Sequence, residues 1–375
     1  MQRLEKIVWL EGIFNEETVV SARAVSPAAN YWQLQFIRAL LNKNISVDVL
    51  GYMPEPLWPR GKLCIGSKDA GLPKNIHGKL INYINFPILR NYNISEAYLK
   101  SVKTLVGLGE KISSVVTFND SPANKAALYL QKKFNIPWIC IVADGEAPHG
   151  ADGYLYLTWG YYKSTDNLGH KIHIDGGVPC VNLADTIRGN KTDEYAKIIM
   201  YMGSMSAHGG VEFLARSFSL LKDSNVELWL CGKGVNHNLR LLAKKDKRIK
   251  LKGYVDEIEL NHLANKATVF VNPRPTQFAA NQLNFPSKIL KYLSYGKPVI
   301  TTMSNGMSPE YANVCVVLED ETEKCLAATI SRVIFLEKNK LIEISAKVEG
   351  FAKTHRWTDQ AEKFIAWINQ DLIDV

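Results

Sequence analysis

The chain has 375 residues, 46% of them hydrophobic and 22% charged, which is typical of globular domains and excludes disordered and fibrous classes. A net charge of +8 favours a polyanionic substrate or an anionic membrane surface. Nucleic acid is not expected, because the basic residues do not gather with aromatic residues into a binding module. The length predicts two domains.

No apolar run is long enough to span a bilayer, and the N-terminus lacks the small-residue cleavage site of a signal peptide. The six cysteines are scattered without CxxC pairs, which predicts reduced, mostly buried thiols. We therefore expect a cytoplasmic protein.

The first half of the chain alternates between short apolar runs and helical periodicity. In chain order we expect strands at residues 5–10, 45–52, 113–120 and 137–144, a polar loop from 11 to 30, and helices at 31–41 and 121–135, the second capped by Ser121. This order predicts a parallel sheet with helices between its strands.

Two of these strands end in polar side chains. Asp120 and Asp144 are their last residues, and Glu146 and His149 stand in the loop after Asp144. Because the carboxyl ends of parallel strands border the ligand crevice, Asp144, Glu146 and His149 are candidates to orient or deprotonate a hydroxyl of a bound ligand. The alternative for each is a solvated loop residue.

The second half alternates more regularly. We expect strands at residues 197–203, 226–231, 249–253, 268–272, 298–302 and 315–318, with helices between them. This pattern predicts a doubly wound parallel sheet. The tail at 356–372 has the spacing of an amphipathic helix.

One stretch, NFPSKILKYLSYGKPVIT at residues 284–301, carries the strongest signal for function. It reads as a helix opened by Pro286 and Ser287, a turn at Gly296 and a buried strand. Ser287 and Lys288 stand at the helix start, where free N–H groups and the macrodipole favour an anion such as phosphate.

Together with KIIMYMGSMSAHGGVEFLARSF at residues 197–218, this stretch resembles the nucleotide-binding half of GT-B glycosyltransferases, most closely glycosyltransferase family 4. The resemblance implies an α/β GT-B fold: two Rossmann-like doubly wound domains facing a cleft, with a C-terminal helix that crosses back to the first domain. The implied domains are an acceptor-binding domain at 1–180 with helix 357–375, a linker at 181–196 and a nucleotide-sugar domain at 197–355.

The sequence departs from that family at four positions. Ser204 and Gly209 stand where an arginine and a lysine usually bind the donor diphosphate, and Leu283 and Lys291 replace the paired glutamates. Lysine has only donors, so Lys291 cannot accept the ribose hydroxyl protons. It either faces solvent or belongs to a branch in which the nucleoside sits differently. Relatives that lack the glutamates bind phosphate through the lysine of an SK pair, which Lys288 matches.

The resemblance and the polar loops together give a set of donor-binding candidates. The turn at residues 203–210 offers hydroxyls, backbone N–H groups and an imidazole to an anion. Arg274 could contact phosphate or an acidic sugar, and the side-chain amides of the loop that follows it could bind sugar hydroxyls. Tyr254 could cover the base. The alternatives for His208 and Lys288 are an exposed loop histidine and a solvated lysine. The full set is Gly203, Ser204, Ser206, His208, Gly209, Gly210, Lys233, Tyr254, Arg274, Gln277, Asn281, Gln282, Ser287 and Lys288.

The expected activity is sugar transfer from a nucleoside-diphosphate donor of UDP or GDP type to a glycan or lipid-linked glycan. No DxD motif or other carboxylate cluster is present, so we expect neither metal nor cofactor, with basic side chains and helix dipoles neutralising the leaving group. The expected setting is capsule or O-antigen synthesis. Lysines such as Lys100, Lys103, Lys132 and Lys133 would favour peripheral contact with an anionic membrane.

Two alternatives stay open. Family membership implies retention of configuration, but the missing glutamates also allow an inverting GT-B transferase, for example a uronosyltransferase, with Asp144 as the general base. The departures at the donor site also fit a non-catalytic GT-B protein that serves as partner to an active enzyme.

Overall fold

A computed structural model of the chain describes residues 4–21, 25–165, 169–179 and 196–373. The chain divides into two compact units, unit 1 with residues 1–177 and 357–375 and unit 2 with residues 178–356. The linker expected at 181–196 lies, except for its last residue, outside the described residues. Among the described residues, no helix combines the length and apolar character needed to cross a membrane.

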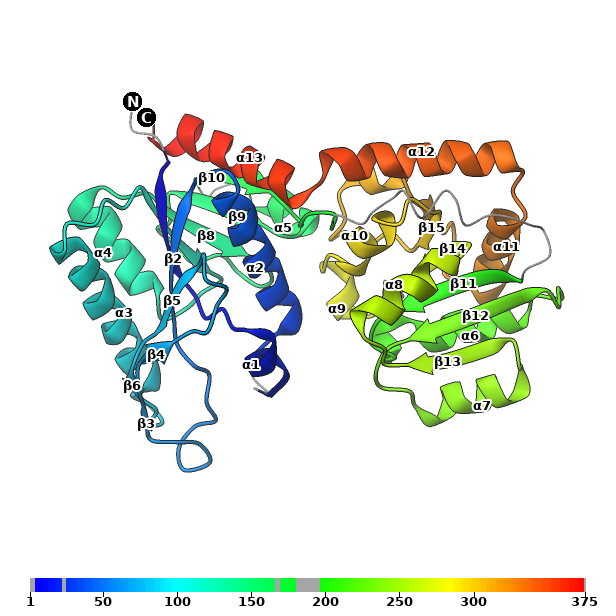
Figure 1. Cartoon of the computed structure of the whole chain (residues 1–375), viewed down its shortest axis with the longest axis horizontal. Coiled ribbons are helices and arrows are strands. Elements are labelled where there is room, and N and C mark those ends of the chain that lie inside the picture. Colours follow the sequence, from blue (N-terminus) through cyan, green and yellow to red (C-terminus); the bar gives the residue numbers. More distant parts are fainter. Residues whose placement is uncertain (1–3, 22–24, 166–168, 180–195, 374–375) are drawn as a thin grey trace. The chain divides into compact units, whose positions relative to one another are not determined.

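Unit 1 is built on an eight-stranded sheet of order β10-β9-β8-β7-β1-β2-β5-β4 (Figure 1). All neighbours pair in parallel except β4, which is antiparallel to β5. The strands are β1 (Lys6–Leu10), β2 (Ser46–Gly51), β4 (Lys68–Asp69), β5 (His77–Leu80), β7 (Ser114–Phe118), β8 (Trp138–Val142), β9 (Gly153–Tyr156) and β10 (His170–His173). A separate antiparallel pair joins β3 (Cys64–Ile65) to β6 (Tyr83–Ile84).

Helices cover both faces of this sheet. They are α1 (Glu16–Ser21), α2 (Pro27–Leu41), α3 (Arg90–Gly107), α4 (Asn124–Phe134), α5 (Trp159–Ser164) and α13 (Trp357–Ile368). Successive side chains of a strand point to opposite faces. Ile7 and Trp9 of β1 accordingly pack with Phe36 of α2, while Val8 and Leu10 pack with the layer formed by α3 and α4. Strand β1 lies between β2 and β7, where the strand order reverses, which is the switch point at which such sheets bind ligands.

Helix α13 completes the core of unit 1, although it comes from the end of the chain. Its side chains Ala361, Phe364, Trp367 and Ile368 are buried in the same cluster as α2, and it lies beside α2 in Figure 1. The predicted crossing of the C-terminal helix back to the first domain is therefore confirmed.

Unit 2 contains a parallel six-stranded sheet of order β13-β12-β11-β14-β15-β16. Its strands are β11 (Lys197–Met202), β12 (Val226–Cys231), β13 (Ile249–Gly253), β14 (Val269–Asn272), β15 (Val299–Thr301) and β16 (Val316–Val317), and its α-helices are α6 (Val211–Ser219), α7 (His237–Lys245), α8 (Glu257–Lys266), α9 (Ala279–Gln282), α10 (Lys288–Leu293), α11 (Glu323–Ile334) and α12 (Lys338–Thr354). Met200 and Met202 face the layer of α8, α10 and α12. Ile199 and Tyr201 face the layer of α6, α7 and α11. The predicted doubly wound sheet is confirmed.

Two local predictions for unit 1 are wrong. The polar loop expected from 11 to 30 contains α1 and the first turn of α2, because Ser26 caps that helix and Pro27 occupies its first position. Ser121 does not cap α4. The helix begins later, after Ala123, and the Ser121 hydroxyl instead accepts the N–H of Ala123.

Candidate donor-binding site

A cavity of about 220 Å³ lies in unit 2 at the carboxyl ends of β11 and β14. These strands are neighbours in the sheet, so the turn after β11 and the loop after β14 meet at one edge. The first turn of α10 closes the cavity. It is lined by Ser206, His208, Gly209, Asn272, Arg274, Pro286, Ser287 and Lys288.

Lys288 is half-buried, and its side chain lies along the wall of this cavity. Its amine donates a hydrogen bond of 2.7 Å to the Tyr201 hydroxyl, and its methylene chain packs against the α-carbon of Gly203. Burial and, to a smaller extent, the nearby charge of Arg274 together lower the pKa of Lys288 to about 8. The alternative of a solvated first-turn lysine is therefore wrong.

Arg274 is held in place by Asn281. The Arg274 Nε donates to the Asn281 side-chain oxygen, and the Asn281 amide donates to the carbonyls of His208 (2.9 Å) and Pro275 (2.7 Å). Asn281 is fully buried and its amide is occupied, so the prediction that it binds sugar hydroxyls is wrong. It positions the arginine and the turn instead. Burial lowers the pKa of Arg274 as well.

The two cations of the cavity have no counterion among the described residues. In the part of the chain that the structure describes, no carboxylate forms an ion pair with Arg274 or Lys288. Two partly desolvated positive charges side by side are unfavourable unless an anion neutralises them. The arrangement therefore fits a ligand with closely spaced negative charges, such as a diphosphate.

The turn after β11 contributes less than the sequence indicates. The N–H groups of Gly209 and Gly210 already donate to the carbonyls of Ser206 and Ala207 inside the turn, so they are not free for a ligand. The Ser206 oxygen accepts from Gly209 and keeps its own hydroxyl proton for donation. Of the residues expected at this turn, Ser206, His208 and Gly209 line the cavity.

Gly203 and Ser204 act on the shape of the turn. Gly203 has φ 143°, and its lack of a side chain makes room for Lys288. The Ser204 side chain is exposed and does not line the cavity, while its carbonyl accepts from the Tyr201 hydroxyl at 2.7 Å. The Tyr201 hydroxyl thus connects the turn at Ser204 to the amine of Lys288.

Helix α10 is only six residues long, so its macrodipole is small and the side chains carry most of the charge. Ser287 precedes it without a side-chain capping bond, which leaves its hydroxyl free toward the cavity. Lys291, one turn further, forms an ion pair with Glu257 of α8 and does not line the cavity. Lys291 therefore points away from the cavity, as in the alternative in which it lies on the exposed side of the helix, although Glu257 supplies it with a partner there.

The remaining donor candidates lie outside the cavity. Lys233 and Tyr254 are exposed after the neighbouring strands β12 and β13, with the lysine amine 4.2 Å from the tyrosine ring centre. Gln277, in the loop after β14, and Gln282, the last residue of α9, are both exposed. They stay candidates for contacts beyond the diphosphate.

The predicted acceptor-side residues lie at the carboxyl edge of the unit 1 sheet. Asp144 follows β8 and accepts a 3.0 Å hydrogen bond from Asn119, which follows the adjacent strand β7. Asp144, Glu146 and His149 are all exposed. Asp120 accepts instead from Asn124 of α4.

Sequence reasoning missed Glu11, which follows β1 at the same edge. Its carboxylate accepts the N–H of Gly12 at 3.1 Å, and burial raises its pKa to about 7. It lies near Tyr98, whose buried hydroxyl has no hydrogen-bond partner among the described residues. The available signal was an acidic residue directly after the first predicted strand, at the switch point of the sheet.

The described residues contain no group of three or more His, Cys, Asp or Glu side chains placed to hold a metal ion.

Residues 196–334 match the family model described as glycosyl transferases group 1. No curated protein sequence matches the chain. Among solved structures, a glycosyltransferase from Rickettsia africae superposes with a TM-score of 0.70 at 13% identity, covering 98% of this chain and 99% of that one.

Two further structures are similar. One is described as trehalose-6-phosphate from E. coli bound with UDP-2-fluoro glucose, with a TM-score of 0.64, 12% identity and coverage of 97% and 99%. The other is a lipopolysaccharide outer core galactosyltransferase, with a TM-score of 0.64, 12% identity and coverage of 98% and 100%. The chain therefore has the GT-B fold, and the match of residues 196–334 to group 1 glycosyl transferases indicates a transferase.

Proposed function

We propose that the protein transfers a sugar from a nucleoside-diphosphate donor of UDP or GDP type to a hydroxyl of a glycan or lipid-linked glycan. The proposed setting is cytoplasmic synthesis of a bacterial surface polysaccharide, such as capsule or O-antigen. The observation that carries the proposal is the cavity of unit 2, in which Arg274 and Lys288 stand together without an acidic partner among the described residues.

The cavity supports a donor diphosphate on chemical grounds. Breaking the bond between the anomeric carbon and the diphosphate builds negative charge on the leaving oxygen, and preorganised cations in a partly dry site stabilise that charge. Hydrogen bonds with Asn281 and Tyr201 hold Arg274 and Lys288 in place. The two side chains therefore need to move little when the negative charge develops. Basic side chains in this position make transfer without a divalent metal feasible, which we include in the proposal.

The similar structures support the substrate classes. One of them holds UDP-2-fluoro glucose, which favours a UDP-type donor here, and another is a galactosyltransferase of the lipopolysaccharide outer core, which favours a surface glycan as acceptor. Asp144 is the proposed base if the reaction inverts configuration, because its exposed carboxylate stands at the carboxyl edge of β8. A non-catalytic partner protein is less well supported, since a donor site that had lost its function would not need two partly buried cations.

Thermal unfolding with UDP, GDP, dTDP and CMP tests the proposal. A ligand at about 100 times its dissociation constant stabilises the folded state by roughly 2.7 kcal/mol, enough for a clear shift in melting temperature. We expect one diphosphate to stabilise the wild type, and Lys288→Ala to abolish the shift. Lys291→Ala is the matched control, since Lys291 lies on the same helix but pairs with Glu257.

Two results would contradict the proposal. If no nucleotide stabilises the wild type at millimolar concentration, the partner-protein alternative is favoured. If Lys288→Ala and Lys291→Ala weaken binding equally, the cavity is not the donor site.

A further inference from the structure

One part of unit 1 concentrates both the charge and the exposed apolar surface of the protein. Residues 54–134 carry twelve Lys or Arg and five Asp or Glu, a net charge of +7 against +8 for the whole chain. Ten of the eighteen large apolar side chains that are exposed among the described residues lie in the same stretch. A surface that is both apolar and basic marks an interaction site.

Five of these apolar side chains lie on two segments that contact each other, and we call them the apolar tip: Leu57, Trp58, Phe86, Ile88 and Leu89. The rings of Trp58 and Phe86 stack with their centres 5.9 Å apart, yet both side chains are exposed. Ile88 leaves 96% of its surface in solvent. Aromatic and aliphatic side chains of this kind are the ones that enter the interfacial region of a bilayer.

The apolar tip has a defined backbone structure. The buried amide of Asn85 donates to the carbonyls of Pro56 (2.7 Å) and Lys62 (3.0 Å), which fastens the loop carrying Trp58 to β6. Ile88 has φ 73°, a conformation that is strained for a β-branched residue. Backbone strain that places a large aliphatic side chain in water is a sign of function.

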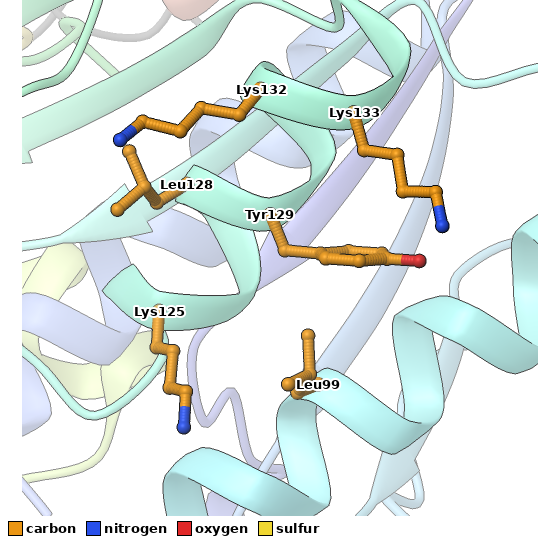
Figure 2. A pocket seen from close by; sticks show the side chains of 6 residues that line it. All are labelled: Leu99, Lys125, Leu128, Tyr129, Lys132 and Lys133. Atoms are coloured by element: carbon orange, nitrogen blue, oxygen red, sulfur yellow. The ribbon is translucent and has the colours of Figure 1, made fainter.

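A second surface, which we call the lysine face, lies where α3 and α4 pack together. It surrounds an open groove of about 410 Å³ lined by Leu99, Lys125, Leu128, Tyr129, Lys132 and Lys133. In Figure 2 the three ammonium groups lie around the three apolar side chains. Lys103 also belongs to it, with its amine 5.0 Å from the centre of the Tyr129 ring.

The lysine face continues into the apolar tip. The Lys125 amine lies 5.7 Å from the ring centre of Tyr92, an exposed residue in the first turn of α3, just after Leu89. Lys125 is paired with Glu96. In the described part of the chain, Lys103, Lys132 and Lys133 form no ion pair with a carboxylate, so the combined surface stays strongly positive.

We propose that the apolar tip and the lysine face dock unit 1 on a lipid bilayer with anionic headgroups. The lysines would lie at the phosphate level while the apolar tip enters the interfacial region. A bilayer fits better than a folded partner, because the lysines border a groove that is open to solvent and their ammonium groups stand apart around it without converging on one point. Access to a lipid-linked acceptor would follow only from the proposed function, whereas the docking itself does not depend on it.

Sedimentation with vesicles tests the docking. The full chain is mixed with vesicles of phosphatidylcholine alone or of equal parts phosphatidylglycerol and phosphatidylcholine. We expect binding to the anionic vesicles only. Each lysine near an anionic surface contributes about fivefold in affinity, so Lys132→Glu with Lys133→Glu should weaken binding by more than tenfold. The double variant Trp58→Ser with Ile88→Ser should weaken vesicle binding at low salt and at high salt alike, because salt screens the attraction of the lysines but not the insertion of apolar side chains.

Matched controls exist in unit 2. Lys244 and Lys245 are an exposed pair in the last turn of α7, as Lys132 and Lys133 are in α4, and Ile258 is 84% exposed. Their substitution by Glu and Ser should leave vesicle binding nearly unchanged.

The proposal is overturned if the wild type ignores anionic vesicles, or if the Lys244 and Lys245 control weakens binding as much as the lysine-face variant. It is also overturned if the wild type is dimeric in solution and Trp58→Ser with Ile88→Ser makes it monomeric, which would assign the surface to a second copy. Nucleotide-induced stabilisation of the same samples separates the two proposals. Vesicle binding without any nucleotide-induced stabilisation would contradict the proposed donor site alone. Nucleotide-induced stabilisation without vesicle binding would contradict the proposed docking alone.

Discussion

The amine of Lys288 stands close to its own titration point, because burial and the charge of Arg274 bring its pKa to about 8. In the unfolded chain its pKa is near 10.5, so the stability that a neutral Lys288 contributes is present above that pH and is lost as the pH falls through 8. A bound diphosphate reverses this cost, since it favours the charged amine. The folded protein thus keeps a protonated lysine at neutral pH at the expense of its own stability, and the ligand recovers that energy.

Nucleotide affinity should therefore fall as the pH rises through the pKa of Lys288. If only the protonated form binds, the dissociation constant increases about tenfold between about pH 7 and about pH 9. Calorimetric titration of the wild type across this range measures the effect. Lys288→Met should bind weakly and without this pH dependence, and Lys291→Ala should behave like the wild type. An equal pH dependence in Lys288→Met would show that another group titrates.

At the scale of elements, the site depends on how closely the turn after β11 approaches α10. A Cβ atom at Gly203 would overlap the end of the Lys288 side chain, and the backbone there has φ 143°. Gly203→Ala should therefore move the lysine and remove nucleotide binding, while the fold is retained at a cost of about 1–3 kcal/mol for the backbone conformation. Gly234→Ala is the control, because it also has positive φ (92°) but meets nothing nearer than 3.9 Å. The nucleotide-induced shift in melting temperature is measured for both variants. Equal shifts would contradict the explanation that a Cβ atom at Gly203 displaces Lys288.

The sequence predicted the strands of unit 2 well because each one is a buried apolar run between turn residues. The expected bounds of β12 and β13 are the observed ones. It also identified Arg274 and Lys288, since a basic residue after a strand or at a helix start stands at the carboxyl edge of a parallel sheet. The burial of Lys288, the role of Asn281 and the occupied N–H groups of Gly209 and Gly210 depend on contacts between segments far apart in the chain. No local pattern encodes such contacts.

Unit 1 was harder to predict for a related reason. The stretch between β2 and α3 consists of very short strands and exposed apolar residues, so it has neither the period of a strand nor that of a helix. Its order comes from single side chains such as Asn85. The carboxyl of Glu11 became notable only when the sheet order placed β1 beside β7.

At the scale of the whole molecule, the core of unit 1 is completed by the last helix of the chain. Phe364 of α13 is fully buried, and its ring lies 5.2 Å from that of Phe36 in α2. Phe364→Ala should cost about 3–5 kcal/mol, the usual range for a buried phenylalanine. Hydrogen exchange should show the loss of protection in residues 1–177, whereas the nucleotide dissociation constant, which depends on unit 2, should stay the same. Phe335→Ala, at a site that is 53% exposed, should change neither quantity. Protection lost equally in both units after Phe364→Ala would show that the two units unfold together, and the donor site would then depend on the last helix as well.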